Sequence, residues 1–182
     1  EMCIRDRSWD YISSQRIDYL IANSNFTAKR IKKYWGRESK VIFPPVNVNR
    51  FNYNKNRGNY YLSVSRLVPN KRVDLIVKAF NKLKYPLIII GDGVDKNYLK
   101  KIKGENIKIL GFQSDKVIKK MMEQCRAFVY AGTEDFGIAP VEAMAAGAPV
   151  IGLEKGGRID TVKCINKENN NPTGVFFKST HI

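Results

Sequence analysis

Short apolar runs alternate with longer amphipathic stretches through most of the chain after Asn59. The runs are three to six residues long and rich in β-branched side chains, which is typical of buried strands in a parallel sheet. They lie at residues 60–65, 87–90, 107–110, 127–130 and 149–151, and residues 175–177 have the same character. A strand followed by a helix, repeated in this way, predicts an α/β fold with a parallel sheet and helices on both faces.

The stretches between these runs carry apolar residues at helical spacing. Asn70 can cap a helix with one apolar face, which is formed by Val73, Ile76, Val77, Phe80 and Leu83. A further helix opens near Asp115 and has Cys125 on its apolar side, so we expect this cysteine to lie in the core. Another helix is predicted between Gly137 and Gly147.

The pattern changes in the first quarter of the chain. Strands are predicted at residues 19–22 and 40–43, on either side of a helix at residues 26–35. A pair of prolines and an asparagine-rich segment interrupt the pattern at residues 44–57, where we place a domain boundary. We therefore expect residues 1–50 to be the remnant of one domain with a linker, and residues 51–182 to be a second domain, truncated at its carboxyl end. Residues 1–8 fit no periodic pattern.

The composition is that of a soluble globular protein, with 43% hydrophobic and 27% charged residues. No apolar run approaches the ~20 residues that cross a bilayer, and the amino-terminal residues do not have the pattern of a signal peptide. The three cysteines, Cys3, Cys125 and Cys164, are scattered. We expect a reducing, cytoplasmic location.

The net charge of +15 and the isoelectric point near 9.8 indicate either an anionic partner or a lysine-rich solvated surface. The lysines are spread along the predicted helices without aromatic residues interleaved on a regular face. Charge alone therefore leaves nucleic acid, an acidic membrane and a phosphorylated small molecule open as partners.

Candidate binding residues follow the first strand of the sheet, at the edge where open parallel sheets bind ligands. Arg66 and Lys71 flank a proline-containing turn that leads to the amino terminus of a helix. Such a terminus already carries about half a positive charge, so two more cations destabilise the free protein unless an anion binds between them. A forked guanidinium and an ammonium suit a diphosphate, whereas solvated turn residues are the alternative interpretation.

A longer turn region at residues 132–147 has one glutamate before a glycine turn and another in the following helix. Backbone N–H groups of residues 136–139 can bind phosphate at the helix start, and Glu142 can reach ribose hydroxyls. Taken singly, Glu142 is equally a favourable charge near a helix amino terminus, and Glu134 part of a polar loop.

These segments form an ordered set: IANSNFTAKRI, VIFPPVNVNRF, VSRLVPNKRVDLIVKAF, IIGDG, EDFGIAPVEAMAAGAPVIG and GGRIDTV. In this order and spacing they resemble the donor-binding domain of glycosyltransferase family 4, whose members are retaining enzymes of the two-domain GT-B architecture. The resemblance covers roughly residues 18–177 and implies a Rossmann-like fold, the carboxyl-terminal half of GT-B. The segment EDFGIAPVEA is similar to that of mannosyltransferases that use GDP-mannose, although related branches use UDP-sugars.

The resemblance implies that Arg66 and Lys71 hold the donor diphosphate and that Glu134 binds hydroxyls of the transferred sugar. We hypothesise that an acceptor hydroxyl attacks the anomeric carbon while the two cations stabilise the departing nucleoside diphosphate. Because these cations already neutralise the leaving group and no Asp-x-Asp triplet occurs, we predict no metal site and no other cofactor.

The remaining donor-binding residues implied by the resemblance lie in turns or at a helix start: Gly91, Phe112, Asp135, Phe136, Gly137, Ile138 and Glu142. Glu142 is expected to hold the ribose, and the backbone of residues 136–138 to contact sugar and phosphate. Gly91 and Phe112 are expected to border the nucleotide base.

The expected partners are a nucleotide-sugar donor and a glycan or lipid-linked acceptor, without nucleic acid. Contact with an anionic membrane is expected to be peripheral, at the inner face. From the resemblance we expect this sequence to lack almost all of the family's acceptor domain, and the single histidine, His181, lies in the tail. Two alternatives remain: a non-catalytic basic module for nucleic acid or membranes, which leaves the glutamates unexplained, and another GT-B enzyme such as a phosphorylase or an epimerase.

Overall fold

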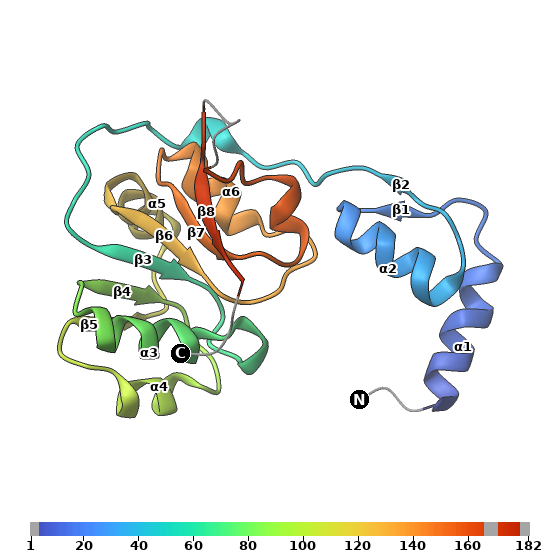
Figure 1. Cartoon of the computed structure of the whole chain (residues 1–182), viewed down its shortest axis with the longest axis horizontal. Coiled ribbons are helices and arrows are strands. Elements are labelled where there is room, and N and C mark those ends of the chain that lie inside the picture. Colours follow the sequence, from blue (N-terminus) through green and yellow to red (C-terminus); the bar gives the residue numbers. More distant parts are fainter. Residues whose placement is uncertain (1–3, 166–170, 179–182) are drawn as a thin grey trace. The chain divides into compact units, whose positions relative to one another are not determined.

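The computed structural model describes residues 4–165 and 171–178. The chain divides into two compact units, Glu1–Pro45 and Val46–Ile182 (Figure 1). The division falls inside the interrupted stretch at residues 44–57. That the first unit is the remnant of a separate acceptor domain stays a prediction.

The second unit is built on a six-stranded parallel sheet. Its strands are β3 (Tyr61–Val64), β4 (Leu87–Ile90), β5 (Ile107–Gly111), β6 (Ala127–Tyr130), β7 (Val150–Leu153) and β8 (Gly174–Phe177). Their order across the sheet is β5-β4-β3-β6-β7-β8. The chain moves outward from β3 to β5 and returns to the other side of β3 with β6. The carboxyl ends of β3 and β6 therefore flank the switch point at which open parallel sheets bind ligands.

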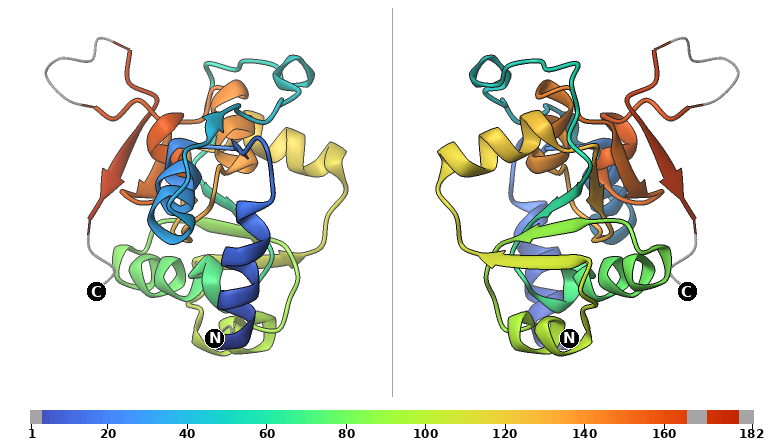
Figure 2. Two further views of the ribbon diagram at one scale, coloured as in Figure 1. Left: turned by 90° about the vertical axis from the view of Figure 1, so that its right-hand side faces the viewer. Right: turned by 90° about the vertical axis from the view of Figure 1, so that its left-hand side faces the viewer.

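Helices cover both faces of this sheet, as the sequence predicts (Figures 1 and 2). The helices are α3 (Val73–Leu83) and α4 (Lys96–Ile102) on one face, and α5 (Asp115–Gln124) and α6 (Ile138–Ala145) on the other. Phe80 of α3 packs with Ile89 and Val129, while Met122 of α5 packs with Phe128. The predicted α/β fold is confirmed.

Cys125 ends α5 and is fully buried in the core beneath that helix. Burial raises the pKa of its thiol to about 11, so the thiol stays protonated at neutral pH. The predicted core position of this cysteine is confirmed.

One local prediction is wrong, and two segments are helical although the periodicity of their sequence does not indicate it. Asn70 does not cap α3, because a 3-10 turn, η2 (Pro69–Lys71), comes first and Arg72 precedes the helix with a φ of 52°. Helix α4 has seven residues and a single buried side chain, Leu99, so its sequence shows no clear periodicity. Residues 1–8 seemed irregular, yet α1 (Ile4–Gln15) begins among them.

The first unit contains α1, β1 (Ile21–Ala22), α2 (Asn25–Trp35) and β2 (Lys40–Val41), with the two short strands parallel. Helix α1 has no apolar stripe, since Trp9 and Ile12 are exposed, and Asp10 accepts a hydrogen bond from the indole of Trp35 at 2.9 Å. Ser24 caps α2 by accepting from the backbone of Thr27 at 3.0 Å.

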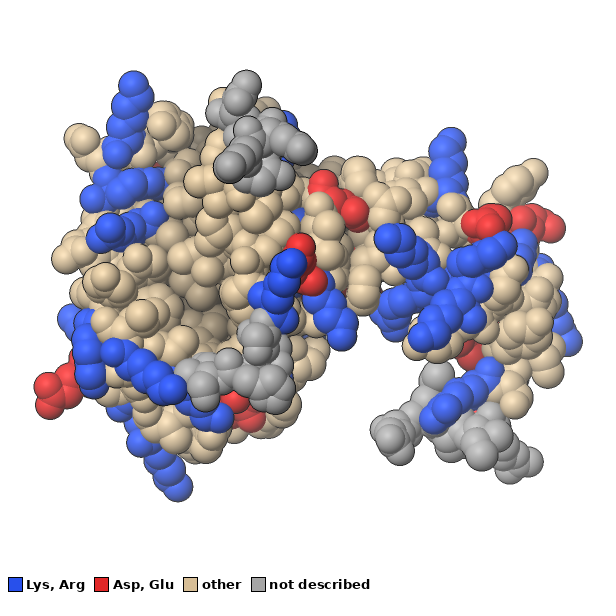
Figure 3. Space-filling model, in the orientation of Figure 1, with Lys and Arg blue, Asp and Glu red and all other residues tan. Residues whose placement is uncertain are grey.

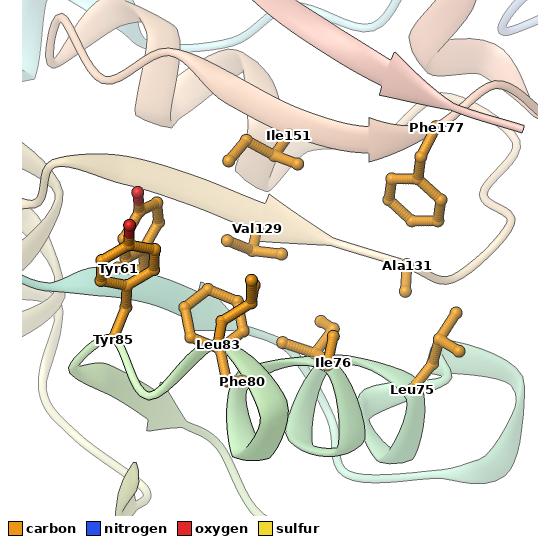
Figure 4. Close-up of a pocket in the computed structure, with 11 residues that line it drawn as sticks. Tyr61, Leu75, Ile76, Phe80, Leu83, Tyr85, Val129, Ala131, Ile151 and Phe177 are labelled. Carbon is orange, nitrogen blue, oxygen red and sulfur yellow. The ribbon is translucent and has the colours of Figure 1, made fainter. Parts of the chain in front are cut away.

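An apolar pocket opens between α3 and the strands β3, β6, β7 and β8 (Figure 4). Ile76 and Phe80 of α3 face Val129 and Ile151 across it. None of its lining residues is charged. A pocket without charge does not suit a diphosphate, whereas the carboxyl edge of the sheet carries charged side chains in the loops after β3 and β6.

Candidate active site

The two strands at the centre of the sheet bring the expected catalytic residues together. Arg66 and Lys71 follow β3, whereas Glu134 follows β6, and these strands are paired. Gly132 makes a close approach possible, because a Cβ there would lie 2.8 Å from the Cα of Lys71. The loop after β6 thus packs backbone against backbone on the turn that carries Lys71.

Glu134 is the centre of a hydrogen-bonded group. Lys71 Nζ forms an ion pair with Glu134 Oε1, and the hydroxyl of Tyr130 donates to the same oxygen. The side chains are largely shielded from solvent, with 12% exposure for Lys71 and 25% for Glu134. A shielded ion pair with a second donor is a charged group held in one orientation.

The protonation states in this group follow from its contacts. Burial by itself raises the pKa of Glu134, but the hydrogen bonds from Lys71 and Tyr130 and nearby positive charges outweigh it and lower that pKa. Burial, followed by the hydrogen bond and charge of Glu134, raises the pKa of Tyr130. At neutral pH Glu134 is therefore a carboxylate and Tyr130 a neutral donor.

The sequence predicts that an anion must bind between Arg66 and Lys71 at the start of a helix, but in the structure an acidic side chain of the protein itself compensates one of these cations. Lys71 lies in the 3-10 turn and not in α3, and Glu134 compensates its charge. Arg66 is exposed, and within residues 4–165 and 171–178 we find no ion pair to it. Arg66 nevertheless lies close enough to the site to oppose the rise in the pKa of Tyr130.

The start of α6 lies in the same loop region. Gly137 has a φ of 91° and precedes the helix, which begins at Ile138. Phe136 is buried, whereas Asp135 and Ile138 are exposed. The amino terminus of α6 thus directly follows the loop that carries Glu134, and the first turn of a helix is a favourable place for an anion.

Gly91 has a structural reason to be glycine. Its φ is 140°, and a Cβ there would lie 1.8 Å from the carbonyl oxygen of Ser65, directly before Arg66. Phe112 follows β5 and is 81% exposed, so its ring is open to a stacking partner. That these two residues border a nucleotide base stays a prediction.

Glu142 has an intramolecular partner that the sequence did not indicate. Arg50 donates to Glu142 Oε1 at 2.6 Å, and Asp115 lies 3.7 Å from the same guanidinium. Burial raises the pKa of Glu142, which the charge of Arg50 opposes. Its assignment to a ribose stays a prediction.

Two further residues at the site were missed. Tyr130 is the last residue of an apolar strand, which gave no reason to assign it a role at the site. Arg158 lies within the GGRIDTV segment, whose sequence does not indicate that this arginine is buried. Arg158 is 1% exposed and donates to backbone carbonyls near Glu134. Among the residues that the structure describes, no cluster of three or more His, Cys, Asp or Glu side chains is arranged to hold a metal ion.

A parallel sheet with a helix terminus and charged side chains at its switch point is the arrangement typical of α/β domains that bind nucleotides. Residues 46–181 match the model of the family described as glycosyl transferases group 1. The chain belongs to this family of glycosyltransferases, and its second unit has the Rossmann-like fold of a GT-B domain.

Similar proteins include the uncharacterized glycosyltransferase MJ1178 of Methanocaldococcus jannaschii, 29% identical over 93% of this chain and 50% of that protein. The alpha-1,3/1,6-mannosyltransferase ALG2 of Candida glabrata is 24% identical over 84% of this chain and 46% of the length of ALG2. The crystal structure of Anabaena HepE in complex with UDP and glucose has a TM-score of 0.78 at 22% identity, with 97% of this chain and 54% of that chain covered. The chain spans about half the length of the curated relatives it matches.

Proposed function

We propose that this chain supplies the donor site of a retaining glycosyltransferase, which transfers a hexose from a nucleoside diphosphate sugar to a glycan or lipid-linked acceptor. The observation that carries the proposal is the meeting of Lys71 and Glu134 at the switch point of the sheet, beside the amino terminus of α6. A basic module for nucleic acid or membranes has no need of a shielded carboxylate held by two donors.

The roles of the side chains follow from their chemistry. Lys71 and Arg66 bind the diphosphate with the amino terminus of α6, and they stabilise the negative charge that develops on the leaving group. Glu134 accepts hydrogen bonds from hydroxyls of the sugar, because it is ionised and only partly covered. Glu142 binds the ribose through its second carboxylate oxygen, since Arg50 contacts Oε1.

We favour GDP-mannose as donor. The segment EDFGIAPVEA and the likeness to mannosyltransferases named ALG2 support mannose, while the HepE structure with UDP and glucose keeps a uridine donor as the competing choice. Two cations and a helix terminus suffice to neutralise the leaving group, so transfer without a metal or other cofactor is part of the proposal.

The direct test is calorimetric titration of the chain with GDP, UDP, GDP-mannose and UDP-glucose in metal-free buffer. We expect saturable binding of one nucleotide family, and about tenfold or greater weakening in Lys71→Ala, the loss expected for one charged hydrogen bond. Lys78→Ala is the matched control, because Lys78 pairs with Asp74 on the exposed side of α3.

Two results of this titration contradict the proposal. A folded chain that binds none of the four ligands has no donor site. Equal weakening by Lys71→Ala and Lys78→Ala indicates general attraction of anions to a chain of net charge +15.

A further inference from the structure

Arg158 is an unusually costly residue to bury. It lies in the 3-10 turn η3 (Gly157–Asp160) after β7, and its side chain is among the largest that are fully buried. Burial lowers the pKa of its guanidinium, against the opposing effects of Tyr130 and Glu134. Its Nε has no hydrogen-bond partner among the described residues. A buried charge of this kind needs a compensating anion or a dense set of acceptors.

The acceptors come from the backbone around the site. Arg158 donates to the carbonyls of Leu153 at 3.0 Å and Tyr130 at 3.3 Å, and also to that of Gly132. One side chain thus joins the end of β7 to the end of β6 and to the first residues of the loop that carries Glu134. The N–H of Gly157 adds a bond of 2.9 Å to the carbonyl of Glu134 itself.

A second connection runs through an aromatic ring. The guanidinium of Arg158 lies 5.1 Å from the ring centroid of Tyr130, and the hydroxyl of that tyrosine donates to Glu134 Oε1. The ring is therefore fixed at one face by the cation and at its far end by the carboxylate. Backbone and side chain of Glu134 are both held by contacts that lead to Arg158.

This arrangement matters once a donor binds. Lys71 forms an ion pair with Glu134 in the free chain, and under the proposed function it binds the diphosphate instead. Glu134 then retains the Tyr130 hydroxyl and the positive charge of Arg158. A carboxylate that lost its position at that moment would bind sugar hydroxyls poorly.

We propose that Arg158 is a positioning residue, which acts through Tyr130 and the Gly132 carbonyl to hold Glu134 in place for the hydroxyls of the transferred sugar. This inference rests on the proposed function. It assigns to Arg158 an effect on the sugar and none on the diphosphate, which separates positioning from general support of the fold.

The test compares a nucleoside diphosphate with its sugar conjugate, GDP with GDP-mannose and UDP with UDP-glucose, by titration of the whole chain. Arg158→Lys removes the fork that reaches the carbonyls, and Tyr130→Phe removes one hydroxyl at little cost in packing. We expect both variants to bind the nucleotide sugar about tenfold more weakly and the nucleoside diphosphate within about twofold of the original chain.

Matched controls exist near the amino ends of the strands, away from the loop that carries Glu134. Arg57 also donates to three backbone carbonyls, those of Met122, Glu123 and Ala146, and the hydroxyl of Tyr60 donates to Met121 at 3.0 Å. Arg57→Lys and Tyr60→Phe should leave the ratio of the two affinities unchanged. Thermal unfolding of each variant shows whether the fold is intact.

The outcomes separate the hypotheses. The positioning role is supported if both variants bind the nucleotide sugar more weakly but bind the nucleoside diphosphate as the original chain does. Equal loss for both ligands, or no loss in Tyr130→Phe, overturns it while the donor site stands. Failure of the original chain to bind any nucleotide overturns the proposed function and this role with it.

Discussion

At the scale of single residues, Glu134 and Glu142 form an instructive pair. Both are partly buried and both lie near an arginine or lysine, yet the pKa of Glu134 is lowered and that of Glu142 is raised. Burial raises the pKa of both carboxyl groups, but Glu134 receives hydrogen bonds from both Lys71 and Tyr130. Glu142 receives one from Arg50 and lies near the negative charge of Asp115, which raises its pKa further. Donors outweigh desolvation at one site and not at the other.

This contrast predicts opposite pH dependences of stability. Glu134 stabilises the fold above its unfolded pKa, about 4.5, and this contribution is lost as pH falls through its lower folded pKa. Acidification should therefore destabilise the original chain relative to Glu134→Gln. For Glu142 the folded pKa is higher than the unfolded one. Acidification should therefore stabilise the original chain relative to Glu142→Gln over the same range.

Urea unfolding of the three proteins between about pH 6 and pH 3 measures these differences. The signs are the critical result. The quantity compared is the difference in free energy of unfolding between the original chain and each variant. If this difference changes with acidification in the same direction for both variants, the contacts described for one of the two carboxylates do not exist in solution.

At the scale of elements, the loop after β6 and the turn after β7 form one packed unit. A Cβ on Gly157 would lie 2.0 Å from the carbonyl oxygen of Asp135, and one on Gly156 would lie 2.5 Å from that of Glu134. Such approaches are closer than any Cβ tolerates, so these two segments must separate if either glycine gains a side chain.

Gly157→Ala should therefore lower the free energy of unfolding by about 1–3 kcal/mol and weaken nucleotide-sugar binding by moving Glu134. The measurement is urea unfolding together with the titration described above. Gly36→Ala is a useful comparison, because Gly36 has a φ of 69° but nothing within 4 Å of an added Cβ. It should cost about 1 kcal/mol through backbone strain and leave binding unchanged. A Gly157→Ala chain with unaltered binding would mean that the loop holds its position without this contact.

At the scale of the whole molecule, the excess of positive charge is spread widely. Lys and Arg side chains occupy several separate groups on the face in Figure 3. Such a distribution favours weak attraction to anionic surfaces over a single specific patch. No helix within the described residues has the length and apolar character to span a membrane, and peripheral contact of the enzyme with anionic lipid at the cytoplasmic face stays a proposal.

We expect binding to vesicles of mixed phosphatidylcholine and phosphatidylserine to be strong at low salt and to be largely lost at about 0.3 M salt. The affinity for the nucleotide at the shielded site should change far less over the same range, because salt screens short-range contacts between partly buried charges only weakly. Vesicle sedimentation and calorimetry at matched salt concentrations measure the two. Vesicle binding that persists at high salt would indicate an apolar contact in place of the electrostatic one.

The sequence by itself determined the repeated strand and helix order, the family motifs and the placement of Arg66, Lys71 and Glu134 at one edge of the sheet. These follow from local periodicity and from the rule that parallel strands end together. Only the tertiary structure decided that Lys71 pairs with Glu134, that Arg50 holds Glu142, and that Arg158 is buried beneath Tyr130. Side chains 28 to 92 positions apart make those last two contacts. Local pattern contains no information on such contacts, because burial of a charge is set by what packs around it and not by its neighbours in the chain.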